Sequence, residues 1–263
     1  MHRSCFHADE LVLMAKVLGK HHILGVPDVS ALLPESEKLE KELDSLERLL
    51  KERVLTFSEN NNLTVSEAYH DLIETCCGSR CMMVMMSKPE QKTVQRLWWP
   101  HQEQFLTAEV SDGVFQFREG SLPALELLAM LEEMQLSRTI RTPIVQFEIP
   151  NIILRKARRD TEQNNPDKAI GALRKGGAKE KEAAEIVAAF QGRRQFFCLS
   201  TAQSSGEGTN VNTMSFLTGE FGTWTLEPHV VNLRSCIKFR QDGNAEHRVK
   251  TAIQQFVSGD DMA

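Results

Sequence analysis

The spacing between hydrophobic positions changes along this chain in a fixed order, and that order occurs twice. In residues 8–136, helical spacing gives way to strand spacing and then to a last amphipathic helix, and residues 150–257 repeat this order. The pattern predicts an α+β fold in which a central antiparallel sheet of meander strands is flanked by helices. We expect a single α/β body over residues 1–263, with quasi-two-fold duplicated halves at 1–140 and 141–263.

The strongest amphipathic pattern lies in the helix expected after Pro34. Its apolar row consists of Leu39, Leu43, Leu46 and Leu50. These positions are four, three and four residues apart, so they share one face of a helix. Such a face packs either on the protein's own core or on a partner, and the first outcome is the commoner one.

Three further stretches predict how the elements connect. Asp112-Gly113 predicts a two-residue hairpin turn, because both residues can take positive φ. Residues 230–239 alternate apolar and polar positions, which predicts one uninterrupted strand with Leu233 on its apolar face. Residues 160–166 contain no apolar residue and predict a polar linker.

Composition narrows the classes of function. The net charge is −5, which argues against non-specific binding of nucleic acid. The longest apolar run, residues 81–86, is far too short to span a bilayer. Residues 1–19 contain Asp9 and Glu10 and no small-residue cleavage site, so we expect no secretory signal and a cytoplasmic location.

The helix, hairpin and helix expected over residues 35–78 have the ground plan of a winged helix. A DNA-binding regulator is therefore the alternative function. Residues 1–78 contain 8 Lys and Arg against 14 Asp and Glu, a net charge of −6. That segment would repel a phosphate backbone, so we rank DNA binding below protein binding.

Recognisable catalytic and metal motifs are missing from the sequence. Gly171 to Gly176 has the spacing of a phosphate loop, but Gly177 stands where lysine is required. We expect no enzyme activity and no cofactor, although an active site assembled from residues distant in sequence stays open. The one cysteine cluster is Cys76, Cys77 and Cys81, with His70 nearby. We expect these to be buried thiols rather than metal ligands.

Three sequence segments in the first quarter of the chain resemble the N-terminal region of a known protein family. They are Ala8-Asp9-Glu10-Leu11 with Leu13 and Leu18-Gly19, then Gly25-Val26-Pro27-Asp28, then the leucine-rich run from Leu46 to Leu55. This region resembles the EspG-like chaperones of type VII (ESX) secretion and their EsaE-like counterparts in Firmicutes. That family has a quasi-two-fold α/β body, so the resemblance implies the same fold for nearly the whole chain.

The resemblance implies a cytosolic chaperone or adaptor that binds a secreted helical-hairpin protein and keeps it soluble for export. Neither nucleic acid nor membrane insertion is expected. The family uses a sheet hairpin loop and helices of the second half for this contact. By position alone, the candidate contacts are Ser87, Lys88, Pro89, Glu90, Lys179, Ala183, Ile186, Val187 and Phe190. The polar stretch at 160–166 departs from the family pattern.

Overall fold

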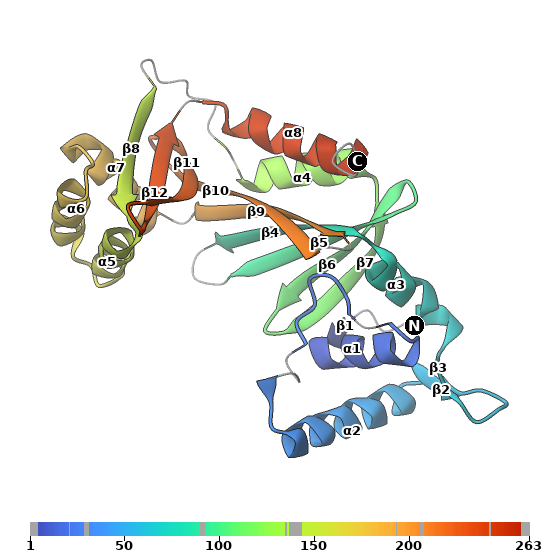
Figure 1. Cartoon of the computed structure of the whole chain (residues 1–263). Helices are drawn as coiled ribbons and strands as arrows, with labels where there is room; N and C mark the ends of the chain where they lie inside the picture. The colour runs from blue at the N-terminus through green and yellow to red at the C-terminus, as the bar shows by residue number, and fades with distance from the viewer. Residues whose placement is uncertain are drawn as a thin grey trace. The chain divides into compact units, whose positions relative to one another are not determined.

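The computed structural model describes residues 5–20, 22–28, 32–89, 93–134, 136, 144–192, 194–205, 208–241 and 243–258. Its strands join into a ten-stranded sheet in the order β1-β7-β6-β5-β4-β9-β10-β11-β12-β8, and β2 and β3 form a separate two-stranded sheet. Figure 1 shows the elements along the chain. The predicted α+β class, with an antiparallel sheet and flanking helices, is confirmed. The duplication stays a prediction.

The strands in chain order are β1 (Cys5–His7), β2 (Leu55–Phe57), β3 (Leu63–Val65), β4 (Cys81–Pro89), β5 (Val94–His101), β6 (Gln104–Ser111), β7 (Val114–Ser121), β8 (Val145–Pro150), β9 (Arg194–Ser205), β10 (Gly208–Gly219), β11 (Gly222–Val231) and β12 (Arg234–Gln241). The helices are α1 (Ala8–Val17), α2 (Glu35–Lys51), α3 (Glu67–Gly78), α4 (Pro123–Met134), α5 (Asn151–Glu162), α6 (Pro166–Lys175), α7 (Glu180–Gln191) and α8 (Ala245–Ser258). Among the described residues, no helix is both long enough and apolar enough to span a membrane.

The chain forms two compact units, and we describe each one separately. Unit 1 comprises residues 1–84, 95–123 and 201–211, and unit 2 comprises residues 85–94, 124–200 and 212–263. Both units therefore take residues from either side of position 140, and the predicted division into halves there stays a prediction.

Unit 1 packs α1, α2 and α3 around an aromatic and aliphatic core. Phe6 of β1 lies at its centre, with its ring edge-on to Tyr69 of α3 at 5.7 Å between centroids and to Phe117 of β7 at 6.2 Å. Trp99 of β5 stacks on Phe117 and donates a hydrogen bond from its indole N–H to the Leu24 carbonyl at 3.0 Å. These contacts join α3 and three strands through one cluster of large rings.

Unit 2 packs α5, α6 and α7 against the sheet edge formed by β8 and β12, and Figure 1 shows the three helices gathered beside β8. Phe147 of β8 stacks on Phe239 of β12 with centroids 5.3 Å apart, and Trp224 of β11 meets both rings edge-on. Ile149 and Leu173 are fully buried in the same cluster. This core fixes the edge of the sheet from which α5 begins.

Two local expectations were wrong. The predicted linker at 160–166 begins instead as helix, because α5 continues to Glu162. Ala157 and Thr161 are buried one helical turn apart, and the Thr161 hydroxyl donates to the Ala157 carbonyl at 2.9 Å. The strand predicted over 230–239 is interrupted, because Asn232 and Leu233 form the turn between β11 and β12. The predicted turn at Asp112-Gly113 is confirmed: φ is +54° and +78° there, between paired Ser111 and Val114.

Candidate partner-binding surfaces

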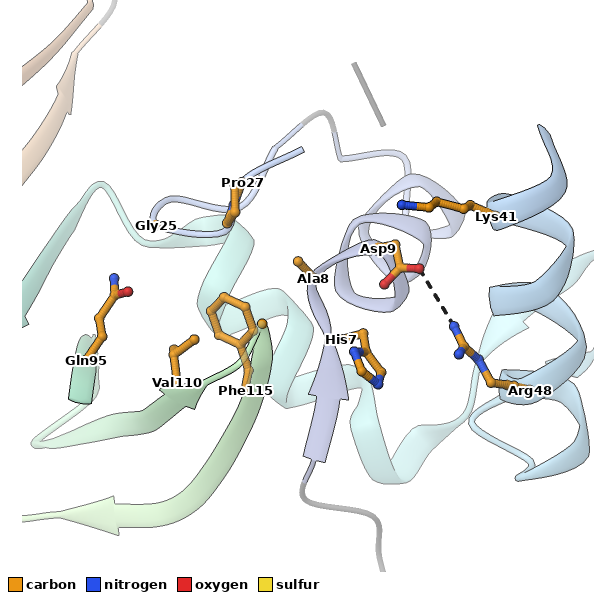
Figure 2. Close-up of a pocket in the computed structure, with 11 residues that line it drawn as sticks. His7, Ala8, Asp9, Gly25, Pro27, Lys41, Arg48, Gln95, Val110 and Phe115 are labelled. Atoms are coloured by element: carbon orange, nitrogen blue, oxygen red, sulfur yellow. Dashed lines mark ion pairs between the residues drawn. The ribbon is translucent and has the colours of Figure 1, made fainter. Parts of the chain in front are cut away.

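Unit 1 has a hollow of about 550 Å³ beside the start of α1, lined by residues of α1, α2 and the β6–β7 hairpin. Figure 2 shows Asp9 from α1 pointing toward Arg48 from α2, with Lys41 farther along the same helix. His7 and Phe115 complete the wall between these charged groups and the strands. The hollow therefore places two cations and one carboxylate together at the junction of two helices.

Arg48 at this hollow already pairs with two carboxylates. Arg48 lies 3.7 Å from the Asp9 carboxylate and, through Nε, 3.3 Å from Oε1 of fully buried Glu10. Glu10 also accepts the backbone N–H of His7 at 2.8 Å, which caps α1. The Ser45 hydroxyl of α2 donates to Asp9 at 2.9 Å. These contacts use the carboxylates to hold the start of α1 against α2, so neither is set up as a general base.

In the cysteine cluster, Cys76 and Cys81 are buried and Cys77 is half-buried. Burial raises the pKa of Cys76 well above its usual value, and the neighbouring Cys77 raises it further. Burial also raises the pKa of Cys77 to about 11, an effect that Lys20 opposes and Glu74 reinforces. A cysteine binds a metal ion as the thiolate, and these surroundings disfavour that form. No group of three His, Cys, Asp or Glu that could hold a metal occurs among the residues described.

Unit 2 presents a surface of different character at the β11–β12 turn. A hollow of about 480 Å³ lies there between the start of α5 and the start of β12, lined by Ile152, Arg155 and Arg234 among others. Ile152 is 78% exposed at its edge, and the turn residue Leu233 is 99% exposed. We call Ile152, Arg155, Val230, Leu233 and Arg234 the tip surface. It combines exposed aliphatic side chains with arginines.

Leu233 adopts a conformation that leucine rarely takes. Val231 and Arg234 are paired, so Asn232 and Leu233 are the two residues of a tight turn, with φ of +46° and +63°. Positive φ is easy for glycine and asparagine but costs other residues about 1–2 kcal/mol. The side chain gains no packing in return, because it is fully exposed. An exposed, strained leucine is a reason to look for a contact outside the chain.

Basic side chains surround the aliphatic part of the tip surface. Arg155, Lys156 and Arg159 are exposed along α5, on the same side of the helix as Ile152. None of the three forms an ion pair with another described residue, whereas Arg158 pairs with Glu162 within the helix. The tip surface therefore offers an aliphatic centre and a positively charged border.

The positions predicted for partner contact fall in varied surroundings. Ser87 is buried in β4, and Lys88 and Pro89 belong to the same strand, whereas Glu90 lies outside the described residues. Lys179 is the exposed N-cap of α7. On α7, three of the predicted residues are buried in the unit 2 core and the fourth is half-buried against it: Ala183, Ile186, Val187 and Phe190. Partner contact at these positions stays a prediction, and three of the α7 side chains face inward.

Sequence reasoning missed the tip surface, because the apolar alternation across residues 230–239 assigned Leu233 to a strand. The signal in the sequence was Asn232, which precedes Leu233, because asparagine tolerates the positive φ that a tight turn needs. Ile152 belongs to α5, and its exposure depends on which face of that helix meets β8. That face is known only from the packed unit.

No protein-family model and no curated protein matches the sequence. Among solved structures, the chain is similar to the Mycobacterium tuberculosis type VII secretion system chaperone EspG5, whose structure was solved in complex with the PE25-PPE41 dimer. The similarity covers 95% of this chain and 94% of that one, with a TM-score of 0.54 and 10% sequence identity. The chain thus has the fold of an EspG chaperone, and the resemblance seen in its first quarter is confirmed at the level of the fold.

Proposed function

We propose that the protein is a chaperone of a type VII secretion system, acting in the cytoplasm. In this function it binds a helical-hairpin secretion substrate and keeps it soluble. The observation that carries the proposal is the fold shared with EspG5 over nearly the full length of both chains. EspG5 was solved with the PE25-PPE41 dimer bound, so a secreted helical protein is the partner class that this fold supports.

We further place the substrate contact of this chain at the tip surface of unit 2. Leu233 and Ile152 offer exposed aliphatic area next to a hollow of about 480 Å³, which suits the apolar end of a helical hairpin. Arg155 and Arg234 at the hollow favour acidic residues on the substrate beside that apolar end. Hiding an apolar end in this way would lower the substrate's tendency to aggregate.

No observation favours the DNA-binding alternative. The hairpin formed by β2 and β3 has the expected place between α2 and α3. Its turn reads Ser58-Glu59-Asn60-Asn61-Asn62 and carries an acid and no cation. A winged helix would need positive charge at that turn to approach phosphates.

The test is a solubility assay. A helical secretion protein encoded beside the gene for this chain would be expressed alone and together with the chain, and its soluble fraction measured after centrifugation. We expect co-expression to raise the soluble fraction, and the variant Ile152→Ser/Leu233→Asn to abolish that effect.

The matched control is Leu125→Ser/Leu128→Ser, which removes two leucines of α4 that are 60% and 58% exposed. It should protect the substrate as well as the unaltered chain does. A substrate whose solubility ignores the chain would contradict the proposed function. Equal loss in the tip variant and the control would contradict the placement of the contact.

A further inference from the structure

A second exposed apolar face lies on α2 in unit 1. Leu39 and Leu43 are 59% and 55% exposed, and Leu46 and Leu50 continue the same row half-buried against the core. The row therefore begins in solvent and ends in the protein. Its spacing of four, three and four residues is that of a helix seam to which a second helix packs.

Two parallel rows border the leucines on either side. One position before the lower part of the leucine row lie Ser45 and Leu49, which are buried where α2 packs on the rest of unit 1. One position after each leucine lie the exposed residues Glu40, Asp44, Glu47 and Lys51. A helix that covered the leucines would thus have the protein on one side and mainly carboxylates on the other.

The three carboxylates of that outer row form no ion pair among the residues that the structure describes. Glu42 on the inner side of α2, in contrast, pairs with Lys16 of α1. The basic residues Lys41 and Arg48 lie on another side of α2, at the hollow shown in Figure 2. The outer row beside the leucines is therefore mainly acidic, with Lys51 at its end as its one cation, whereas Lys41 and Arg48 lie away from the leucines.

We propose that this face of α2 binds an amphipathic helix of another protein, one that carries a leucine-type stripe flanked by lysine or arginine. Charge complementarity selects this occupant, because the acidic row needs cations opposite it. It also argues against a second copy of the chain, since antiparallel packing of two α2 helices along their leucines would bring acidic rows together. Parallel packing would set each acidic row against the partner's inner row, which is already buried against unit 1. The surface differs in sign from the tip surface, so the two take partners of opposite charge.

The test uses the full chain and two synthetic helical peptides. Both peptides have leucines at the a and d positions of three heptads; one has lysine on its flanks and the other has glutamate. Fluorescence anisotropy measures their binding at low salt and at moderate salt. We expect the lysine peptide to bind, with at least tenfold lower affinity for the variant Leu39→Ser/Leu43→Ser and weaker binding as salt rises.

Two further variants test whether the peptide binds this face of α2 or binds exposed apolar residues non-specifically. Leu125→Ser/Leu128→Ser removes equally exposed leucines from α4 and should bind the lysine peptide as the unaltered chain does. Glu40→Lys/Glu47→Lys should reverse the preference, so that the glutamate peptide binds more tightly.

Three results would overturn the proposal: equal binding of both peptides, equal loss in the α4 control, or dissociation of a dimer by Leu39→Ser/Leu43→Ser. The result is independent of the proposed secretion function, because a chain that ignores every secretion substrate can still discriminate the two peptides.

Discussion

The exposed leucines of α2 and the tip surface of unit 2 are both apolar, but they are built differently. On α2 the leucines extend a row that is already half-buried at its other end, in a regular helix. At the tip, Leu233 stands alone on a turn whose backbone is strained. The charge around them also differs, since acids border the α2 leucines and arginines border the tip. The comparison shows that exposed apolar area does not define a partner until its border charges and its support are known.

The largest effect is expected from a substitution in the aromatic cluster that supports the tip surface. Phe239 of β12 is fully buried and contacts both Phe147 and Trp224. Phe239→Ala should lower the free energy of unfolding by about 3–5 kcal/mol, because it opens a cavity in this aromatic cluster. Urea denaturation followed by tryptophan fluorescence measures the loss. A change below about 1 kcal/mol would show that the cluster does not support unit 2.

The equivalent support of α2 is the ion pair network of Arg48. Arg48→Met leaves the carboxylate of Glu10 buried without its cation, while its aliphatic part is kept. Because Arg48 itself is about half exposed, we expect a loss of about 1–3 kcal/mol rather than the full cost of a buried pair. Glu42→Gln, which removes an exposed partner of Lys16, is the control and should cost less than about 1 kcal/mol. Equal losses in urea denaturation would contradict the role given to Arg48.

The two turns of the sheet show what the sequence can and cannot predict. Asp112-Gly113 and Asn232-Leu233 both take positive φ between paired strands. The first is predictable because glycine marks it, whereas the second is hidden by a leucine that continues the apolar alternation. Burial across the fold sets the remaining limit: Ala183 and Ile186 were predicted as contacts by position alone, and both are buried in the unit 2 core because of how α7 packs. The edge strand β8 pairs with β12, which lies far along the chain, so its place in the sheet does not follow from local sequence.

A substitution that relieves the backbone strain at Leu233 should not lower the free energy of unfolding, unlike the two substitutions above. Leu233→Asn should leave the free energy of unfolding unchanged or raise it by up to about 1 kcal/mol, because asparagine tolerates positive φ and no packing is lost. The same variant should weaken substrate protection. Thermal melting followed by circular dichroism measures the first effect. A drop of more than about 1 kcal/mol would mean that Leu233 serves stability rather than contact.

The smallest expected effect is on the rate at which the Cys77 thiol is alkylated. The pKa of Cys77 is raised to about 11 by burial, so its thiol is almost fully protonated at pH 7.5 and should react slowly with iodoacetamide. Its rate should rise about tenfold for each pH unit up to that pKa, as long as the fold persists. Peptide mapping by mass spectrometry should show faster labelling in Arg48→Met, which loosens unit 1, and no change in Leu233→Asn. Faster labelling in both would mean that the two surfaces share their support.

The most direct test of the proposed function is the mass of a complex. The chain has a mass of 29.7 kDa, and it would be co-expressed with helical secretion proteins from its own gene neighbourhood and passed through size exclusion with light scattering. The account predicts one peak whose mass equals one chain plus one copy of the substrate or of its heterodimer. A peak at the mass of the chain alone, with every candidate substrate eluting separately, would contradict it.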